Sequence, residues 1–349
     1  GLFDWGANIL TMARGGSSLW FGQFTRGALR YTPPAEPGGA GDWLLLSPET
    51  SPVLGDAFLT LGTHPDGVVL MGTDNVTFGG SPNDEYGVDV LIDQDRPRDP
   101  ASWLHLPPSQ LGGNQVRAIA VTDRDVVWIA VAGAGLVRWD VNGRSAGPDD
   151  PLTWRDTADD HWAGPLTAVD GTDIDLAATQ ALLPGPDGTL LAGGSGLVQL
   201  RYAPALDLAT LVDAWKVKDS AFTEGLIGQT VLGLARDRNQ DVWALTSAGL
   251  NRLRFGEQDV RIDAYTDLET YFTLDPSFYA PSVIVALPGG TYRDLAASAT
   301  GDLLVLSSDL GAAQVAVPRA SGEVSEDADA AYLYPNPFPG ETAAERISL

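Results

Sequence analysis

Apolar and polar positions alternate in short runs along most of the chain, and the runs recur in a fixed order. In "DRNQDVWALTSAGLNRLRF", residues 237–255, a polar turn leads into the apolar run 242–245. A Gly-Leu pair then separates this run from a second one that ends at Phe255. Short apolar runs bounded by Gly, Asn, Asp or Pro are typical of β-strands. The pattern therefore predicts two strands joined by a tight turn.

This pattern is repeated along the chain. Its counterparts occupy residues 17–31, 66–80, 125–139, 187–202 and 301–317. We expect first strands at 9–13, 57–61, 116–121, 177–183, 231–235 and 292–298, and outer strands at 2–5, 43–46, 103–106, 153–157, 215–217 and 262–266. The period of roughly fifty to sixty residues is that of β-propeller blades. We therefore expect an all-β propeller of four-stranded blades, with single helical turns only at 207–212 and 269–274.

Residue types within the repeat have structural explanations. The first strands are small and apolar, as expected where blades crowd together near an axis. The second strands carry Trp or Leu, which we expect to fill the space between blades. Gly at equivalent points supplies the permissive backbone of a tight turn; these residues are Gly27, Gly135, Gly196 and Gly249. The repeated residues are thus interpreted as core and turn positions.

The two ends of the chain suggest how the propeller closes. The chain begins with an outer-type strand at 2–5, whereas its last repeat ends at Val317 on a third-type strand. An open strand edge between the first and last blades would invite aggregation. We therefore expect the N-terminal strand to complete the last blade and give six blades, with a seventh possible in the irregular stretch 265–290.

Composition excludes several classes of function. The chain has 349 residues, no Cys and a formal net charge of −25. The absence of Cys excludes disulfides and thiolate chemistry, and the charge argues against nucleic acid or an anionic membrane as a partner. No apolar run is long enough to cross a bilayer. Lys216 and Lys218 are the only lysines, which fits either a protein adapted to strong salt or a genome that favours Arg codons.

The repeat resembles a known family. Gly225-Leu226, Trp243 and Gly249-Leu250 follow in the order found in the two-component-regulator propeller repeat, although Gln240-Asp241 replaces the usual Gly before the Trp strand. The resemblance covers roughly residues 1–317. It implies a propeller that serves as a binding or sensing domain.

The C-terminus carries a second resemblance. Residues 318–331 form an acidic linker without apolar periodicity. The following segment, 332–349, is similar to the start of an Ig-like type IX secretion C-terminal sorting domain, truncated here, with its motif at Tyr334, Pro335, Asn336, Pro337 and Phe338. This domain order resembles PorZ-like surface components and implies export to the outer surface of a Gram-negative bacterium, the secretion machinery as a partner, and recognition of an anionic glycan. PorZ-like proteins carry two propellers, and this chain accounts for one.

No catalytic or cofactor constellation stands out. His64, His105 and His161 lie in different repeats without metal-ligand spacing, and His64 is interpreted as a turn residue. Two segments, 147–162 and 170–178, are strongly acidic. Asp170, Asp173 and Asp175 are weak calcium candidates, with a solvated acidic loop as the alternative. No carboxylate pair can be singled out as a glycosidase centre.

We therefore expect a non-enzymatic, secreted or surface-exposed propeller that binds a protein partner or a surface glycan. The binding surface is predicted at one end of the ring, where loops 74–90, 140–175 and 265–290 gather. Candidate contact aromatics are Tyr86, Trp154, Trp162, Tyr271 and Tyr279, with blade packing as the alternative. Three other functions remain open, namely an exported carbohydrate-active enzyme, a structural subunit of an extracellular assembly, and a sensor ectodomain of a two-component regulator.

Overall fold

A computed structural model describes most of the chain. The described residues are 9–23, 26–34, 40–73, 87–123, 125–143, 153–203, 206–218, 225–228, 230–256, 260–266, 271–272, 291–298, 301, 303–308, 311–317 and 332–335. They divide into two compact units, and each is described separately. One unit holds residues 1–192 and 199–213, and the other holds 193–198 and 214–349.

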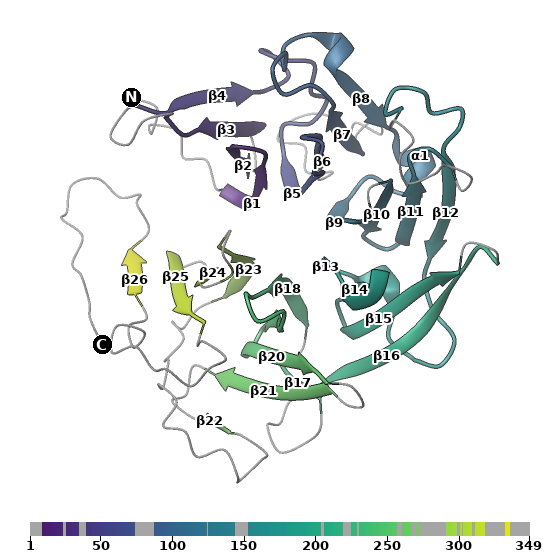
Figure 1. Ribbon diagram of the computed structural model, residues 1–349, viewed down its shortest axis with the longest axis vertical. Coiled ribbons are helices and arrows are strands. Elements are labelled where there is room, and N and C mark those ends of the chain that lie inside the picture. Colours follow the sequence, from purple (N-terminus) through teal and green to yellow (C-terminus); the bar gives the residue numbers. More distant parts are fainter. Residues whose placement is uncertain are drawn as a thin grey trace. The chain divides into compact units, whose positions relative to one another are not determined.

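The first unit contains three successive four-stranded antiparallel sheets (Figure 1). Their strands are β1 (Ile9–Gly15), β2 (Ser18–Gln23), β3 (Ala28–Thr32), β4 (Asp42–Leu46), β5 (Phe58–Thr63), β6 (Val69–Thr73), β7 (Val88–Leu91), β8 (Trp103–Leu106), β9 (Val116–Asp123), β10 (Val126–Val131), β11 (Gly135–Asp140) and β12 (His161–Leu166). Short helices η1 (Pro100–Ser102) and α1 (Pro108–Leu111) precede and follow β8. In each sheet the strands are hydrogen-bonded in chain order, so each outer strand follows its own inner three.

The first strands of these sheets, β1, β5 and β9, lie side by side. The side chain of Ile119 on β9 packs directly on Gly62 of β5, where an added Cβ would lie 2.5 Å from Ile119 Cγ2. Small residues are therefore required here, as the sequence predicted. The second strands carry large side chains that the next sheet covers; Trp20 is fully buried and Trp128 is 3% exposed. Sheets that pack face to face around adjacent first strands make the β-propeller fold.

The structure shows why glycine is required at two of the predicted turns. Gly27 and Gly135 have φ of 90° and 115°, in the left-handed region that glycine tolerates. A Cβ would lie 2.0 Å from Leu46 O at Gly27 and 2.2 Å from Leu166 O at Gly135. The outer strand therefore crosses directly over each turn. Gly249 fits the same rule, with φ 134°, whereas Gly196 does not have a positive φ.

The second unit contains two further sheets. Their strands are β18 (Val231–Arg236), β19 (Val242–Thr246), β20 (Gly249–Phe255), β21 (Val260–Thr266) and β22 (Tyr271–Phe272), then β23 (Tyr292–Ala297), β24 (Leu303–Ser308), β25 (Gly311–Ala316) and β26 (Tyr332–Pro335). First strands β18 and β23 are again adjacent. A Cβ on Gly233 would lie 2.8 Å from the backbone nitrogen of Leu295. The packing rule is therefore the same in both units.

One more sheet has the order β13-β14-β15-β16-β17 and includes residues of both units. Its strands are β13 (Ala181–Pro184), β14 (Leu190–Gly193), β15 (Gly196–Ala203), β16 (Leu208–Lys218) and β17 (Leu226–Ile227), with η2 (Leu176–Ala178) and η3 (Pro186–Gly188) beside β13. Three blades thus lie in the first unit and two in the second, which gives five, one fewer than the six predicted.

The predicted closure is wrong at the last blade. The strand that pairs with β25 on its outer side is β26, with Gly311 opposite Pro335 and Gln314 opposite Tyr332. Residues 2–5, predicted for this place, lie outside the described residues. The chain therefore returns to the same sheet at β26, a pairing that strand patterning does not reveal.

Local predictions failed at three other places. The predicted helical turn at 207–212 is the start of strand β16, and residues 271–272 of the other form β22, which extends the β18–β21 sheet. The outer strand predicted at 153–157 is β12 at His161–Leu166 instead. β12 also runs through the middle of the predicted 140–175 loop. The segments before and after β12 therefore start from opposite ends of this strand.

Candidate functional site

An Arg faces a Trp at the same place in three sheets. Each Arg lies three residues after a turn glycine and pairs across the strands with the Trp. The pairs are Trp20–Arg30, Trp128–Arg138 and Trp243–Arg252, with the guanidinium carbon 5.8, 6.0 and 5.3 Å from the indole centre. These distances allow cation–π attraction. The motifs "GALR", "GLVR" and "GLNR" carry this signal in the sequence, although it was not among the predicted sites.

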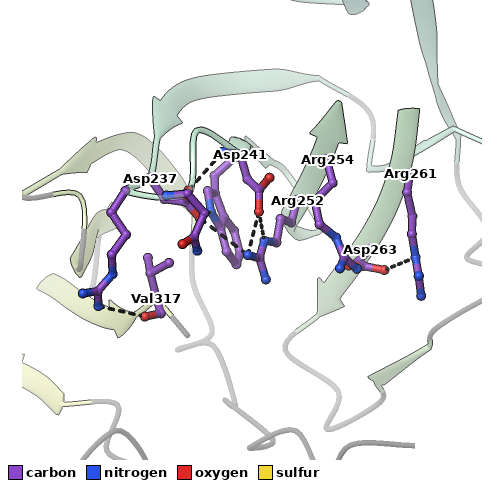
Figure 2. Close-up of polar contacts among 10 residues, drawn as sticks. Asp237, Asp241, Arg252, Arg254, Arg261, Asp263 and Val317 are labelled. Atoms are coloured by element: carbon purple, nitrogen blue, oxygen red, sulfur yellow. Dashed lines mark hydrogen bonds and ion pairs between the residues drawn. The ribbon is translucent and has the colours of Figure 1, made fainter. Parts of the chain in front are cut away.

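Around Arg252 the polar groups form a closed network (Figure 2). The Arg252 guanidinium donates to Asp241 Oδ2 from Nε at 2.9 Å and contacts it from Nη2 at 2.6 Å. Asp237 accepts the backbone N–H of Asn239 at 2.8 Å and the indole N–H of Trp243 at 2.9 Å. Burial raises the pKa of Asp241, and Arg252 opposes that shift. These contacts fix the β18–β19 turn.

The rest of Figure 2 is also structural. Arg254 donates to Asp263, and Arg261 Nε lies 3.5 Å from the same carboxylate. Arg254 and Arg261 are directly opposite each other on β20 and β21. Asp263 therefore offsets the repulsion between two facing cations. Arg238 donates to the carbonyl of Val317 at 3.2 Å and ties the β18–β19 turn to the end of β25.

Arg138, at the corresponding position of the first unit, has different surroundings. It donates to Asp140 Oδ2, and the ring of Tyr202 lies 3.9 Å from its guanidinium carbon. Asp140 is only 3% exposed, and its Oδ1 has no hydrogen-bond partner among the described residues. Burial raises the pKa of Asp140, and Arg138 opposes that shift. This carboxylate is therefore only half satisfied.

His161 lies between two carboxylates. Its Nδ1 is 3.7 Å from Asp140 Oδ2, and its Nε2 is 3.6 Å from Asp207 Oδ2. Both distances exceed hydrogen-bond range, so the contacts are ionic when the imidazole is protonated. Tyr202 donates its hydroxyl to Asp207. His161 and Asp207 are 27% and 44% exposed, and they form the solvent-facing side of the group.

Asp160 is the second incompletely bonded carboxylate. The indole N–H of Trp139 donates to its Oδ2 at 2.7 Å, while its buried Oδ1 has no partner in the described part of the chain. Burial raises the pKa of Asp160 to about 7; the Trp139 hydrogen bond lowers it, and neighbouring carboxylates raise it further. We call Arg138, Asp140, Asp160, His161, Tyr202 and Asp207 the β11–β12 acidic cluster.

Two of the predicted aromatics pack against Trp139, whose indole binds Asp160, on the sheet face opposite Asp140 and His161. Trp162 stacks on Trp139 with ring centres 5.2 Å apart and planes 7° apart, and it is half-buried. Trp154 is 6% exposed and packs edge-on against Trp139 and His64, so it is core, as the alternative interpretation held. Tyr86, Tyr279 and the side chain of Tyr271 lie outside the described residues.

The calcium candidates are not brought together. Asp170, Asp173 and Asp175 are all exposed, and the described residues contain no group of three side chains that could hold a metal ion. Asp175 instead accepts the N–H of Ala177 and begins η2. Of the sorting motif, Tyr334 and Pro335 belong to β26, and residues 336–338 lie outside the described residues.

The other two histidines have structural partners. His64 Nδ1 accepts the backbone N–H of Asp66 at 3.0 Å, which confirms its role in a turn. His105 lies 2.6 Å from Asp89, whose second oxygen accepts the backbone N–H of Leu54 at 2.9 Å. Of the acidic segments, 147–162 contributes Asp160 to the cluster. Asp140 and Asp207 were missed, because strand pairing and a β15–β16 turn bring them together.

No helix among the described residues is long and apolar enough to cross a membrane. No family model matches the chain, and no curated protein matches it either. Solved structures match its fold. PorZ, a surface component of the type IX secretion system of Porphyromonas gingivalis, gives a TM-score of 0.56 at 14% identity, covering 95% of this chain and 41% of PorZ.

Two other solved structures show similar folds. The extracellular domain of a proposed hybrid two-component system from B. thetaiotaomicron gives a TM-score of 0.53 at 15% identity, covering 92% of this chain and 34% of that one. A candidate 6-phosphogluconolactonase from Bacteroides uniformis gives 0.52 at 13% identity, covering 94% of each chain. The chain therefore has an all-β propeller fold, and it spans well under half the length of the PorZ and two-component structures.

Proposed function

We propose that this chain is a non-enzymatic propeller binding module of a secreted or cell-surface protein, with the β11–β12 acidic cluster as its ligand site. The observation that carries the proposal is the pair of buried carboxylate oxygens, Asp140 Oδ1 and Asp160 Oδ1, without a donor among the described residues. A buried acceptor without a donor costs free energy. A ligand that supplies donors here gains that free energy on binding.

The neighbouring groups favour a neutral oligosaccharide. Sugar hydroxyls donate hydrogen bonds to carboxylates, and a sugar ring bound beside Asp160 can stack on the half-buried indole of Trp162, which lies with Trp139 on the sheet face opposite Asp140 and His161. Asp156 and Asp159 add negative charge next to Asp160. This charge opposes the anionic glycan that the PorZ resemblance implies, so anionic glycans and a protein partner are the alternatives.

Calorimetry with neutral and anionic oligosaccharides tests this proposal. We expect binding of a neutral member, about tenfold weaker in Asp140→Asn, because the substitution replaces a carboxylate acceptor by an amide. Asp241→Asn is the matched control, since it makes the same change in the closed network of the second unit, and it should leave affinity unchanged. No binding by the neutral panel, or equal loss in both variants, would refute the proposal.

A second candidate function, an exported carbohydrate-active enzyme, is favoured by one observation. A carboxyl group with a pKa of about 7, as at Asp160, is suited to act as a general acid. This function predicts release of reducing ends from a polysaccharide and its loss in Asp160→Asn. Such turnover would overturn the binding-only proposal, whereas binding without turnover supports it.

We also propose that the β13–β17 sheet is the sixth blade of a closed ring, which the sequence repeat supports.

We propose further that the motif 334–338 directs export through the type IX machinery, which its resemblance to the sorting domain supports. Replacing residues 336–349 in the full-length protein leaves β26 in place and should abolish surface display. Retained display would contradict the export proposal. A transmembrane helix and kinase downstream in the gene would favour the sensor alternative, and loops that contact neighbouring subunits would favour the structural one.

A further inference from the structure

Strand β16 carries an exposed apolar surface that outer strands β4 and β8 lack. Among the described residues, five large hydrophobic side chains are exposed, and three lie together: Leu206 at 71%, Leu208 at 50% and Val212 at 46%. Leu208 and Val212 are on the same face of β16, four residues apart, with exposed Thr210 between them. Leu206 precedes the strand in the adjoining turn. We call Leu206, Leu208 and Val212 the β16 stripe.

Outer strands β4 and β8 of the first unit cover most of the surface of their apolar residues. Trp43 of β4 is 36% exposed, but it packs on Tyr31 at 4.5 Å between ring centres. On β8, Trp103 and Leu106 are 7% and 2% exposed. An outer strand therefore has no need of exposed Leu and Val for the stability of its own blade. The stripe is a feature of β16 alone among these strands.

Among the described residues, no strand pairs with the outer backbone edge of β16 beside the stripe. In the described part of the sheet, the strand on this side is β17, and it pairs only with Val217 and Lys218. An uncovered edge next to an apolar face is the arrangement that accepts an added strand, with backbone hydrogen bonds for affinity and alternate side chains for specificity.

We propose that the β16 stripe docks an extended peptide segment of a partner protein, apolar at alternate positions and basic at the positions between. Charge selects this occupant: the chain has 46 acidic and 21 basic residues, and exposed Asp207 and Asp213 border the stripe. A second copy of this chain would bring an equal net charge of −25 to the same edge. The border of the stripe shares only Asp207 with the acidic cluster, and the proposal does not depend on the ligand of that cluster.

Fluorescence anisotropy with a synthetic nine-residue peptide of alternating Val and Lys tests the proposal. We expect saturable binding, weakened about tenfold by Leu208→Asn and about threefold by the nearly isosteric Val212→Thr. The control Met12→Asn also replaces an exposed apolar side chain, on β1, and should leave affinity unchanged. A Val and Glu peptide, and the Val and Lys peptide N-methylated along its pairing edge, should not bind.

Several outcomes would overturn the proposal. Equal binding by all variants would mean general electrostatic adsorption, and no binding at millimolar peptide would exclude the site. Dimerisation in sedimentation experiments that Leu208→Asn abolishes would assign the stripe to a second copy instead. Thermal unfolding of each variant shows whether it is folded. If Leu208→Asn does not fold, Val212→Thr still tests the proposal.

Discussion

Arg138 and Arg252 occupy the same position of the repeat, three residues after a turn glycine and opposite a tryptophan, yet their surroundings differ. Arg252 lies in a network where Asp237 and Asp241 accept several hydrogen bonds. Beside Arg138, one oxygen of Asp140 lacks a partner among the described residues. The same repeat position thus stabilises a turn in one blade, whereas in another it lies beside a carboxylate oxygen that has no donor among the described residues.

The largest expected loss of stability follows a substitution in the closed network around Arg252. Asp237→Ala removes the acceptor of the Asn239, Asp241 and Trp243 N–H groups and leaves these donors unsatisfied. We expect a loss of about 3 kcal/mol in the free energy of unfolding, measured by urea denaturation. Asp237→Asn keeps one oxygen and should cost roughly a third of that. If Asp237→Ala costs less than about 1 kcal/mol, the network is not the stabilising element inferred here.

Replacing each Arg by Lys compares the two regions directly. Arg252→Lys loses the two-pronged contact with Asp241, and we expect a cost of about 2 kcal/mol. Arg138→Lys loses one hydrogen bond and its contact with the Tyr202 ring, and about 1 kcal/mol is expected. Equal costs, measured by thermal and urea unfolding of both variants, would contradict the contrast between the regions.

In the β11–β12 acidic cluster, removing the charge of Asp160 should stabilise the protein. The pKa of Asp160 is raised to about 7 in the folded state, above its unfolded value of 3.8. The contribution of Asp160 to stability is therefore greatest below pH 3.8 and declines as pH rises towards 7, because ionising the buried group opposes folding. Asp160→Asn should raise the free energy of unfolding by about 1 kcal/mol at pH 8, with a smaller gain at pH 5. A loss of stability at pH 8 would contradict this interpretation.

The smallest effect on stability is expected for a substitution of His161. Its carboxylate contacts of 3.6 and 3.7 Å are long, and the side chain is partly exposed. His161→Asn should change stability by less than about 0.5 kcal/mol while weakening ligand binding. A stability loss above about 1 kcal/mol would make His161 a structural residue rather than part of a ligand site.

The sequence predicted most of the strands because their signals are local. Alternation, the Trp positions and the turn glycines placed β10, β11, β19 and β20, where apolar runs and turn residues agree. It missed β26 because this strand joins its sheet through the distant residues 332–335, which no local pattern links to β25. It mistook the start of β16 for a helical turn because Leu208, Leu211 and Val212 also fit helical spacing.

The site was harder to predict than the fold. The acidic segment 147–162 was recognised and contains Asp160, but acidity alone does not separate a solvated loop from a cluster. Asp140 and His161 meet because β11 and β12 pair in a particular register. Asp207 joins them from a turn where its own φ is 54°. These contacts depend on tertiary structure, which residue spacing does not encode.

The most direct test of the β11–β12 acidic cluster as a ligand site is a pH titration of aspartate carboxyl groups by carbon-13 NMR. The Asp160→Asn variant assigns the signal. The account predicts that Asp160 titrates near pH 7 in the free protein, and that its pKa falls when a neutral oligosaccharide donates hydrogen bonds to the carboxylate. A titration near pH 4 that saturating oligosaccharide does not change would contradict the account.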